Sequence, residues 1–225
     1  ANQKNHKEEL NVEDALTQSE AFIIKNKNVI IGTVAAIILI VAGVLMYKNL
    51  YAEPREEKAQ AALFKSQQLF EMDAFEMALN GDSISGEGFL KVASDFSGTK
   101  AANLARAYAG ICYANLGENE KAIKELEKFS GADLMVSPSV LGAIGNCYAK
   151  LNQFDKAASY LVKAADQADN NSLSPIFLMQ AGNIYEEQGK YADAAKAYTK
   201  IKEKYFNSYQ AMDIDKYIER AKLSK

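Results

Sequence analysis

Side chains that perform catalysis or bind metals are sparse in this chain of 225 residues. His6 is the single histidine, and Cys112 and Cys147 are the only two cysteines, so the sequence cannot build a histidine-rich zinc site or a histidine-dependent catalytic triad. The glycine-rich stretch 81–88 lacks the lysine of a phosphate-binding loop and the alternating Asp and Asn residues of a calcium loop, so we interpret it as a loop that precedes a helix. We therefore expect no catalytic residue, no metal site and no cofactor, and we predict that the chain is not an enzyme.

The composition indicates a folded, helical protein. Lys and Arg number 26 against 29 Asp and Glu, and the resulting net charge of −3 argues against a dedicated nucleic-acid binder. Hydrophobic residues make up 48% and charged residues 24%, which is ordinary for a globular domain. With three prolines and 13 glycines, the chain has few residues that break helices. We predict an all-α fold.

Residues 28–47 (NVIIGTVAAIILIVAGVLMY) contain no charged side chain. As a helix they would extend about 30 Å, the thickness of the bilayer core. Lys25, Lys27 and Lys48 flank the run, and Tyr47 stands where membrane proteins place aromatic residues. A cleaved signal peptide would have a shorter apolar core and a shorter leader than these 27 residues, and a soluble helix is rarely apolar all round. The run predicts a single transmembrane helix.

The tail before this helix, residues 1–27, is short and slightly acidic. Apolar residues recur among Glu and Gln between residues 8 and 24, a pattern typical of a loose amphipathic helix. Two interpretations stay open: a docking helix for a membrane partner, or a tail without fixed structure. Charge leaves the membrane orientation open as well, because two lysines precede the apolar run and three basic residues follow it (Lys25 and Lys27; Lys48, Arg55 and Lys58).

The rest of the chain carries an internal repeat. Gly110, Gly145 and Gly182 lie 35 and 37 residues apart. Each unit predicts two helices joined by a tight turn, with small residues that let the two backbones approach. Because one pair cannot bury its apolar face alone, we expect the pairs to stack into a solenoid. The same residue types follow each glycine: tyrosine after three positions (Tyr113, Tyr148, Tyr185), a turn former after seven (Gly117, Asn152, Gly189), alanine after twelve (Ala122, Ala157, Ala194) and a large apolar residue after sixteen (Leu126, Leu161, Tyr198).

These units resemble tetratricopeptide repeats. The resemblance is carried by residues 107–122 (AYAGICYANLGENEKA), 141–157 (LGAIGNCYAKLNQFDKA) and 179–195 (MQAGNIYEEQGKYADAA). It implies a helical solenoid over residues 55–225, with about four helix pairs and a capping helix over residues 209–223.

The first of these pairs is degenerate. We expect its helices over residues 55–79 and 85–96, with Leu90 and Ala93 in the second helix. We also expect Ser137 and Ser174 to cap the first helices of two later pairs, because each precedes a proline at the first turn.

The two cysteines occupy the same position in adjacent units, two residues after Gly110 and Gly145. Packed helices lie about 8–10 Å apart, whereas a disulfide needs Cα atoms within about 7 Å. We expect Cys112 and Cys147 to be two small buried thiols rather than a disulfide.

A short tail, one membrane helix and a repeat domain of this size resemble the YfgM-like family, the ancillary subunits of the bacterial SecYEG translocon. The resemblance implies a single-pass inner-membrane protein with its N-terminus in the cytoplasm and its repeats in the periplasm. It also implies the translocon and its associated membrane proteins as partners, together with periplasmic chaperones or emerging secreted chains.

In tetratricopeptide proteins, the side chains one, four and five residues after the glycine face a concave groove, and the resemblance implies the same here. Asn146 and Asn183 would form a short ladder of amides, and an amide both donates to and accepts from a peptide backbone. The alternative is that both are merely solvated. Too few basic residues are present for a clamp that holds a C-terminal carboxylate. The candidate partner-binding residues are Ile111, Asn115, Asn146, Lys150, Met179, Asn183 and Glu187, with Ala114, Ala149 and Glu186 facing the same way.

The predicted function is that of a membrane-tethered interaction scaffold of the Sec machinery. An accessory scaffold of another bacterial envelope assembly or secretion complex is the alternative, because one fold serves many partners. The sequence leaves the oligomeric state and the ligand of the groove open.

Overall fold

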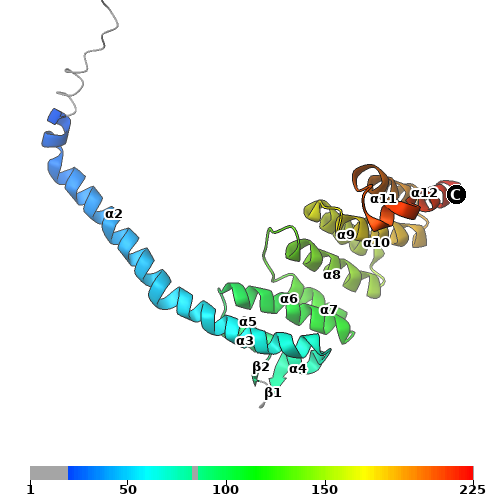
Figure 1. Cartoon of the computed structure of the whole chain (residues 1–225), viewed down its shortest axis with the longest axis horizontal. Helices are drawn as coiled ribbons and strands as arrows, with labels where there is room; N and C mark the ends of the chain where they lie inside the picture. The colour runs from blue at the N-terminus through cyan, green and yellow to red at the C-terminus, as the bar shows by residue number, and fades with distance from the viewer. Residues whose placement is uncertain (1–19, 83–85, 225) are drawn as a thin grey trace, which may run out of the picture. The chain divides into compact units, whose positions relative to one another are not determined.

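The computed structural model describes residues 20–82 and 86–224, which are almost entirely helical (Figure 1). The chain divides into two compact units, Ala1–Pro54 and Arg55–Lys225. The all-α prediction is confirmed: the strands among the described residues are two short segments that pair with each other, β1 (Gly81–Asp82) and β2 (Gly86–Glu87).

The first unit contains the apolar helix. α2 (Lys27–Tyr47) includes the whole predicted span of residues 28–47, and by length and composition it can cross a membrane. A five-residue π-helix, η1 (Lys48–Ala52), follows it, and there the rings of Tyr47 and Tyr51 lie 5.4 Å apart. The predicted helix of residues 8–24 falls mostly outside the described residues.

The second unit is a row of helix pairs (Figure 1). Each pair consists of a first helix, a tight turn and a second helix. The pairs are α6 (Lys100–Asn115) with α7 (Asn119–Leu126), α8 (Val136–Lys150) with α9 (Phe154–Ala168), and α10 (Ser174–Glu187) with α11 (Tyr191–Lys204); the 3₁₀ helix η2 (Tyr209–Asp213) and α12 (Ile214–Leu223) follow, and α3 (Glu53–Glu71), α4 (Phe75–Asn80) and α5 (Phe89–Asp95) precede them.

The turn between the two helices of each pair has a left-handed residue where the repeat predicts one. Gly117, Asn152 and Gly189 have φ angles of 80°, 58° and 69°. Glycine adopts this conformation freely, and asparagine is among the residues that tolerate it best. The prediction of helix pairs joined by tight turns is confirmed.

The repeated glycines allow close helix contact, as the pattern predicts. A Cβ atom at Gly145 would lie 2.9 Å from Cγ of Leu161 and 3.1 Å from the carbonyl oxygen of Ala157. The glycine at 110 meets Leu126 and Ala122 in the same way, and the glycine at 182 meets the ring of Tyr198. The second helix therefore packs directly on the backbone of the first in all three pairs.

The stretch 55–79 is two helices rather than the single helix that its spacing predicts. α3 ends at Glu71, and Asp73 takes a left-handed conformation (φ 56°) before α4 begins at Phe75. The chain then runs back along α3: Ser66 Oγ donates to the Glu87 carbonyl at 2.6 Å, and Arg55 Nη2 donates to the Asp95 carbonyl at 3.0 Å.

The second helix of this first pair is therefore α4 and α5 together, interrupted by the β1–β2 hairpin. The hairpin leaves and re-enters at Gly81 and Gly88, where backbone meets backbone: a Cβ at Gly88 would collide with Leu79 and Asn80. Leu90 and Ala93 lie in α5, the second helix, as predicted. Phe89, Val92 and Ala93 are buried in the core, and Leu90 is only half-buried.

The serine caps of the sequence prediction are wrong. α8 begins at Val136, and the Asp133 carboxylate accepts from the backbone N–H groups of Met135, Val136 and Ser137 at 2.8, 2.5 and 3.2 Å. Asn170 serves α10 in the same way, because its Oδ1 accepts from the N–H groups of two residues just before the helix, at 2.9 Å each. A short acceptor upstream of the turn reaches these donors better than a serine that has already become helical.

Candidate functional site

The seven predicted partner-binding residues stand on the first helices of three successive pairs. Asn115, Asn146, Lys150, Asn183 and Glu187 are exposed, whereas Ile111 and Met179 are half-buried. Because they recur at related positions of α6, α8 and α10, we treat them as one surface and call it the first-helix face. Their role in binding stays a prediction.

The asparagines of this face are not equivalent. Asn183 Oδ1 accepts a hydrogen bond from the Tyr198 hydroxyl at 3.0 Å. Asn115 is turned back on its own helix, since its Nδ2 donates to the Ile111 carbonyl at 2.9 Å. The Asn146 side chain makes no hydrogen bond within residues 20–82 and 86–224. Of the two asparagines that are predicted to form an amide ladder, Asn183 is therefore held by a hydrogen bond and Asn146 is not.

Asn183 belongs to a polar network that joins three helices. The Tyr198 hydroxyl of α11 also lies 3.2 Å from Glu186 Oε2 of α10. Arg220 of α12 donates to Glu186 through Nε at 3.0 Å and through Nη2. Burial raises the pKa of the Tyr198 phenol, so its hydroxyl stays protonated at neutral pH and acts as a donor.

The sequence reasoning did not find this network. The available signal was Tyr198 itself, which stands sixteen residues after Gly182 where the other two units have leucine. Arg220 gave no signal, because only the folded register of α12 brings it to Glu186, 34 residues away in sequence.

The second helices α9 and α11, together with the residues at their ends, are joined by ion pairs between residues about one repeat apart. Asp155 pairs with Lys190 at 2.5 Å, Asp169 with Lys204 at 2.5 Å, and Asp166 with Lys200. Tyr205 adds a hydrogen bond to Asp169 at 3.0 Å. The side chains of these pairs are exposed, so they align neighbouring repeats more than they stabilise them.

Comparison with protein families decides what these pairs are. Two segments match models described as tetratricopeptide repeat, residues 140–173 and residues 177–208. They correspond to α8–α9 and α10–α11. The chain contains tetratricopeptide repeats. No curated protein matches the sequence.

The matches leave out α6–α7, although its glycine, its turn and its alanine are those of the other two repeats. The second helix of this pair, α7, has eight residues, whereas α9 has 15 and α11 has 14. The irregular segment 127–135 stands where the other pairs have the second half of that helix. We interpret this pair as a shortened tetratricopeptide repeat.

The cysteines of the first two repeats are free and buried. Burial raises the pKa of Cys112 to about 12, and it raises the pKa of Cys147 as well. A thiol with a raised pKa is a poor nucleophile at neutral pH. Within the part of the chain that the structure describes, no group of three or more His, Cys, Asp or Glu side chains could hold a metal ion.

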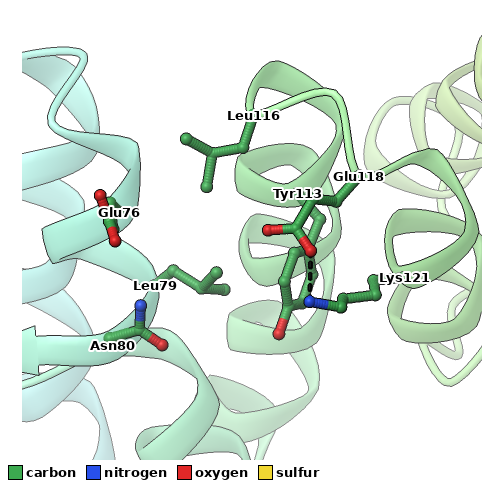
Figure 2. A pocket seen from close by; sticks show the side chains of 7 residues that line it. All are labelled: Glu76, Leu79, Asn80, Tyr113, Leu116, Glu118 and Lys121. Atoms are coloured by element: carbon green, nitrogen blue, oxygen red, sulfur yellow. Dashed lines mark ion pairs between the residues drawn. The ribbon is translucent and has the colours of Figure 1, made fainter.

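A cleft of about 270 Å³ lies between α4 and the turn that joins α6 to α7 (Figure 2). Glu118 and Lys121 form an ion pair on one wall, and the Lys121 ammonium lies 5.4 Å from the centre of the Tyr113 ring. The volume is below the range of about 300–1,000 Å³ in which small-molecule sites usually fall. The cleft contains none of the seven predicted residues, and its lining is Glu76, Leu79, Asn80, Tyr113, Leu116, Glu118 and Lys121.

Proposed function

We propose that this chain is a non-enzymatic scaffold of the bacterial Sec protein-translocation machinery, tethered to the inner membrane. Tetratricopeptide repeats are protein-interaction domains, and their presence is the observation that carries the scaffold part of the proposal. The likeness of tail, membrane helix and repeat domain to the YfgM-like family supports the translocon as partner, with periplasmic chaperones or emerging polypeptides as further ligands.

The membrane part of the proposal rests on α2. Its 21 residues suffice to cross the hydrocarbon core, and lysines stand at both ends. We propose that the tail is cytoplasmic and the repeats periplasmic. The family likeness supports this orientation, whereas the flanking charges are nearly balanced.

The mechanism is tethering. A membrane helix confines the repeats to the neighbourhood of other membrane proteins, so contacts that are weak in solution become effective at a high local concentration. The first-helix face supplies such contacts, because it combines exposed amides and charges with the half-buried apolar side chains of Ile111 and Met179.

The test is a pull-down of the full chain from native membranes in mild detergent, read by quantitative mass spectrometry. We expect SecYEG subunits in stoichiometric amounts. Recovery of a different envelope complex would contradict the Sec assignment and favour the alternative scaffold role. Spheroplast proteolysis tests the orientation: cleavage within residues 55–225 by external protease is expected, and protection would contradict it.

The role of the first-helix face is tested by the double variant Asn146→Ala and Asn183→Ala. The matched control is Asn171→Ala with Asn207→Ala, two exposed asparagines outside the face. We expect partner recovery to fall in the first variant alone. Equal recovery in both would contradict the assignment of the face.

A further inference from the structure

The Tyr198 side chain extends from α11 and packs its ring against Gly182 of α10. Its hydroxyl thereby reaches Asn183 of the first-helix face. Its ring is fully buried, and a Cβ at position 182 would collide with that ring. The hydroxyl lies between two acceptors, Asn183 Oδ1 at 3.0 Å and Glu186 Oε2 at 3.2 Å. A phenol has one hydrogen to donate, so only one acceptor can take it fully at a time.

Arg220 competes with the Tyr198 hydroxyl for one of these acceptors, Glu186. Its guanidinium donates hydrogen bonds to both carboxylate oxygens of Glu186 and compensates the negative charge of that side chain. The Tyr217 ring holds the guanidinium in place, with its centre 4.9 Å from the Arg220 Cζ atom. This competition favours donation from the Tyr198 hydroxyl to Asn183, the nearer of its two acceptors at 3.0 Å.

We propose that Arg220 and Tyr198 are positioning residues: they fix the Asn183 amide so that its Nδ2 group donates to a main-chain carbonyl of an extended polypeptide bound on the first-helix face. This inference rests on the proposed function. It adds that the third repeat is the ordered anchor of the face, and that the capping helix α12 sets this order.

The chemistry of the ligand follows from the free groups of Asn183. Its oxygen is engaged by Tyr198, while its Nδ2 has no acceptor among the described residues, and the residue is exposed. The free group can therefore donate to an acceptor from outside the chain, either water or a ligand. Glu187 stands one turn further along α10, is exposed and repels a carboxylate, so the neutral carbonyl of a main chain fits best.

The other two repeats lack this device. Leu126 and Leu161 take the place of Tyr198, and Ala114 and Ala149 take the place of Glu186. The amide of Asn146 therefore rotates freely and must be ordered when a ligand binds. An amide that is already ordered binds the same group with a smaller loss of entropy.

The positioning step is tested on the full chain in detergent micelles by NMR of ¹⁵N-labelled asparagine side chains. Tyr198→Phe keeps the ring and removes the hydroxyl; Arg220→Met keeps the stem and removes the donors. We expect both to shift the Asn183 Nδ2 resonances and to increase the mobility of this amide, seen as changed ¹⁵N relaxation. Adding Glu186→Ala to Arg220→Met removes the competing acceptor, so the Asn183 signals should return towards the wild-type values.

Two matched controls separate positioning from general loosening. Tyr160→Phe removes another tyrosine hydroxyl. This hydroxyl donates to Glu127 at 3.3 Å and makes no contact with Asn183. Lys202→Gln removes a different contact of α12, the 2.6 Å pair with Asp215. We expect the Asn183 signals to stay unchanged in both. Unchanged signals in Tyr198→Phe, or no recovery on adding Glu186→Ala, would overturn the positioning role.

The ligand is tested with reduced and carboxymethylated α-lactalbumin, a polypeptide that stays unfolded, by fluorescence titration of the full chain. Tyr198→Phe and Arg220→Met should weaken its binding about threefold to tenfold, the effect of one lost hydrogen bond, and the two controls should bind normally. If the wild-type chain binds but both positioning variants bind equally well, the assignment of the ligand fails. If the wild-type chain does not bind, the extended-polypeptide ligand fails, and the NMR experiment still decides the positioning role.

Discussion

Phe177 of α10 packs its ring against the backbone of Gly142 of α8. A Cβ atom at position 142 would lie 2.9 Å from both Cδ1 and Cζ of the ring, closer than real Cβ contacts in proteins. The contact joins two successive repeats. It depends on a glycine outside the pattern that repeats along the sequence.

We expect Gly142→Ala to destabilise the repeat domain. Alanine improves helix propensity by up to about 1 kcal/mol, but overpacking a tight contact costs about 1–3 kcal/mol, so the net effect should be a loss of stability. Urea unfolding of the full chain in detergent, followed by circular dichroism, measures it. Adding Phe177→Leu should recover part of the loss. Unchanged or increased stability of Gly142→Ala would show that the ring has room to move.

The Asp133 cap should make stability depend on pH in acid. Hydrogen bonds from the Ser137 hydroxyl and from three backbone N–H groups lower the pKa of Asp133 from its usual 3.8 to about 2. Because the pKa is lower in the folded state, the stabilisation is present above about pH 4 and is lost as the pH falls towards 2. Asp133→Ala should cost about 1 kcal/mol at neutral pH, the usual value of a helix cap.

Asp133→Asn is the matched variant for this prediction. It keeps an acceptor oxygen but cannot be protonated, so it should lose less stability than Asp133→Ala and make stability less sensitive to acid. Thermal unfolding at pH 7 and pH 2.5 compares the two. Equal acid sensitivity in all three proteins would contradict the assigned role of this carboxylate.

The thiols should be unreactive while the chain is folded. Burial raises the pKa of Cys112 to about 12, so almost no thiolate forms at pH 7 to 8. We expect an aromatic disulfide reagent to label Cys112 and Cys147 slowly in the native chain and rapidly after unfolding in urea. Fast labelling of the native chain would contradict their burial, and a disulfide on non-reducing gels would contradict their free state.

The ion pairs between second helices should contribute little energy each. A double-mutant cycle with Asp166→Ala and Lys200→Ala should give a coupling below about 1 kcal/mol, since both side chains are exposed. The coupling should also fall in high salt, because ions screen exposed charges. A coupling of several kcal/mol, or one insensitive to salt, would contradict the solvent exposure of this pair.

The sequence predicted those parts of the fold that repeat. The spacing of Gly110, Gly145 and Gly182 predicted which helices touch, and Gly117, Asn152 and Gly189 predicted where the chain turns, because each of these effects depends on local geometry. The apolar helix was equally clear, since twenty uncharged residues have few alternatives.

The parts that were missed depend on contacts across the fold. Nothing near Asp133 shows that its carboxylate reaches the start of α8 before Ser137 does. Tyr198 was predicted as one more apolar contact, and its hydroxyl acquires a role only when Arg220 arrives from α12 to satisfy Glu186. The interruption of the second helix by residues 81–88 was invisible, because glycine-rich loops commonly end helices rather than divide them.

The close backbone contact between Gly81 and Gly88, at the base of the β1–β2 hairpin, has a consequence for how this protein can evolve. The chain leaves and returns at nearly the same place, so the helix pair needs only that the two ends meet. Selection can lengthen, shorten or replace what lies between them while the neighbouring pairs keep their spacing. The first helix pair is therefore a position where a new binding loop can be inserted without changing the packing of the other pairs.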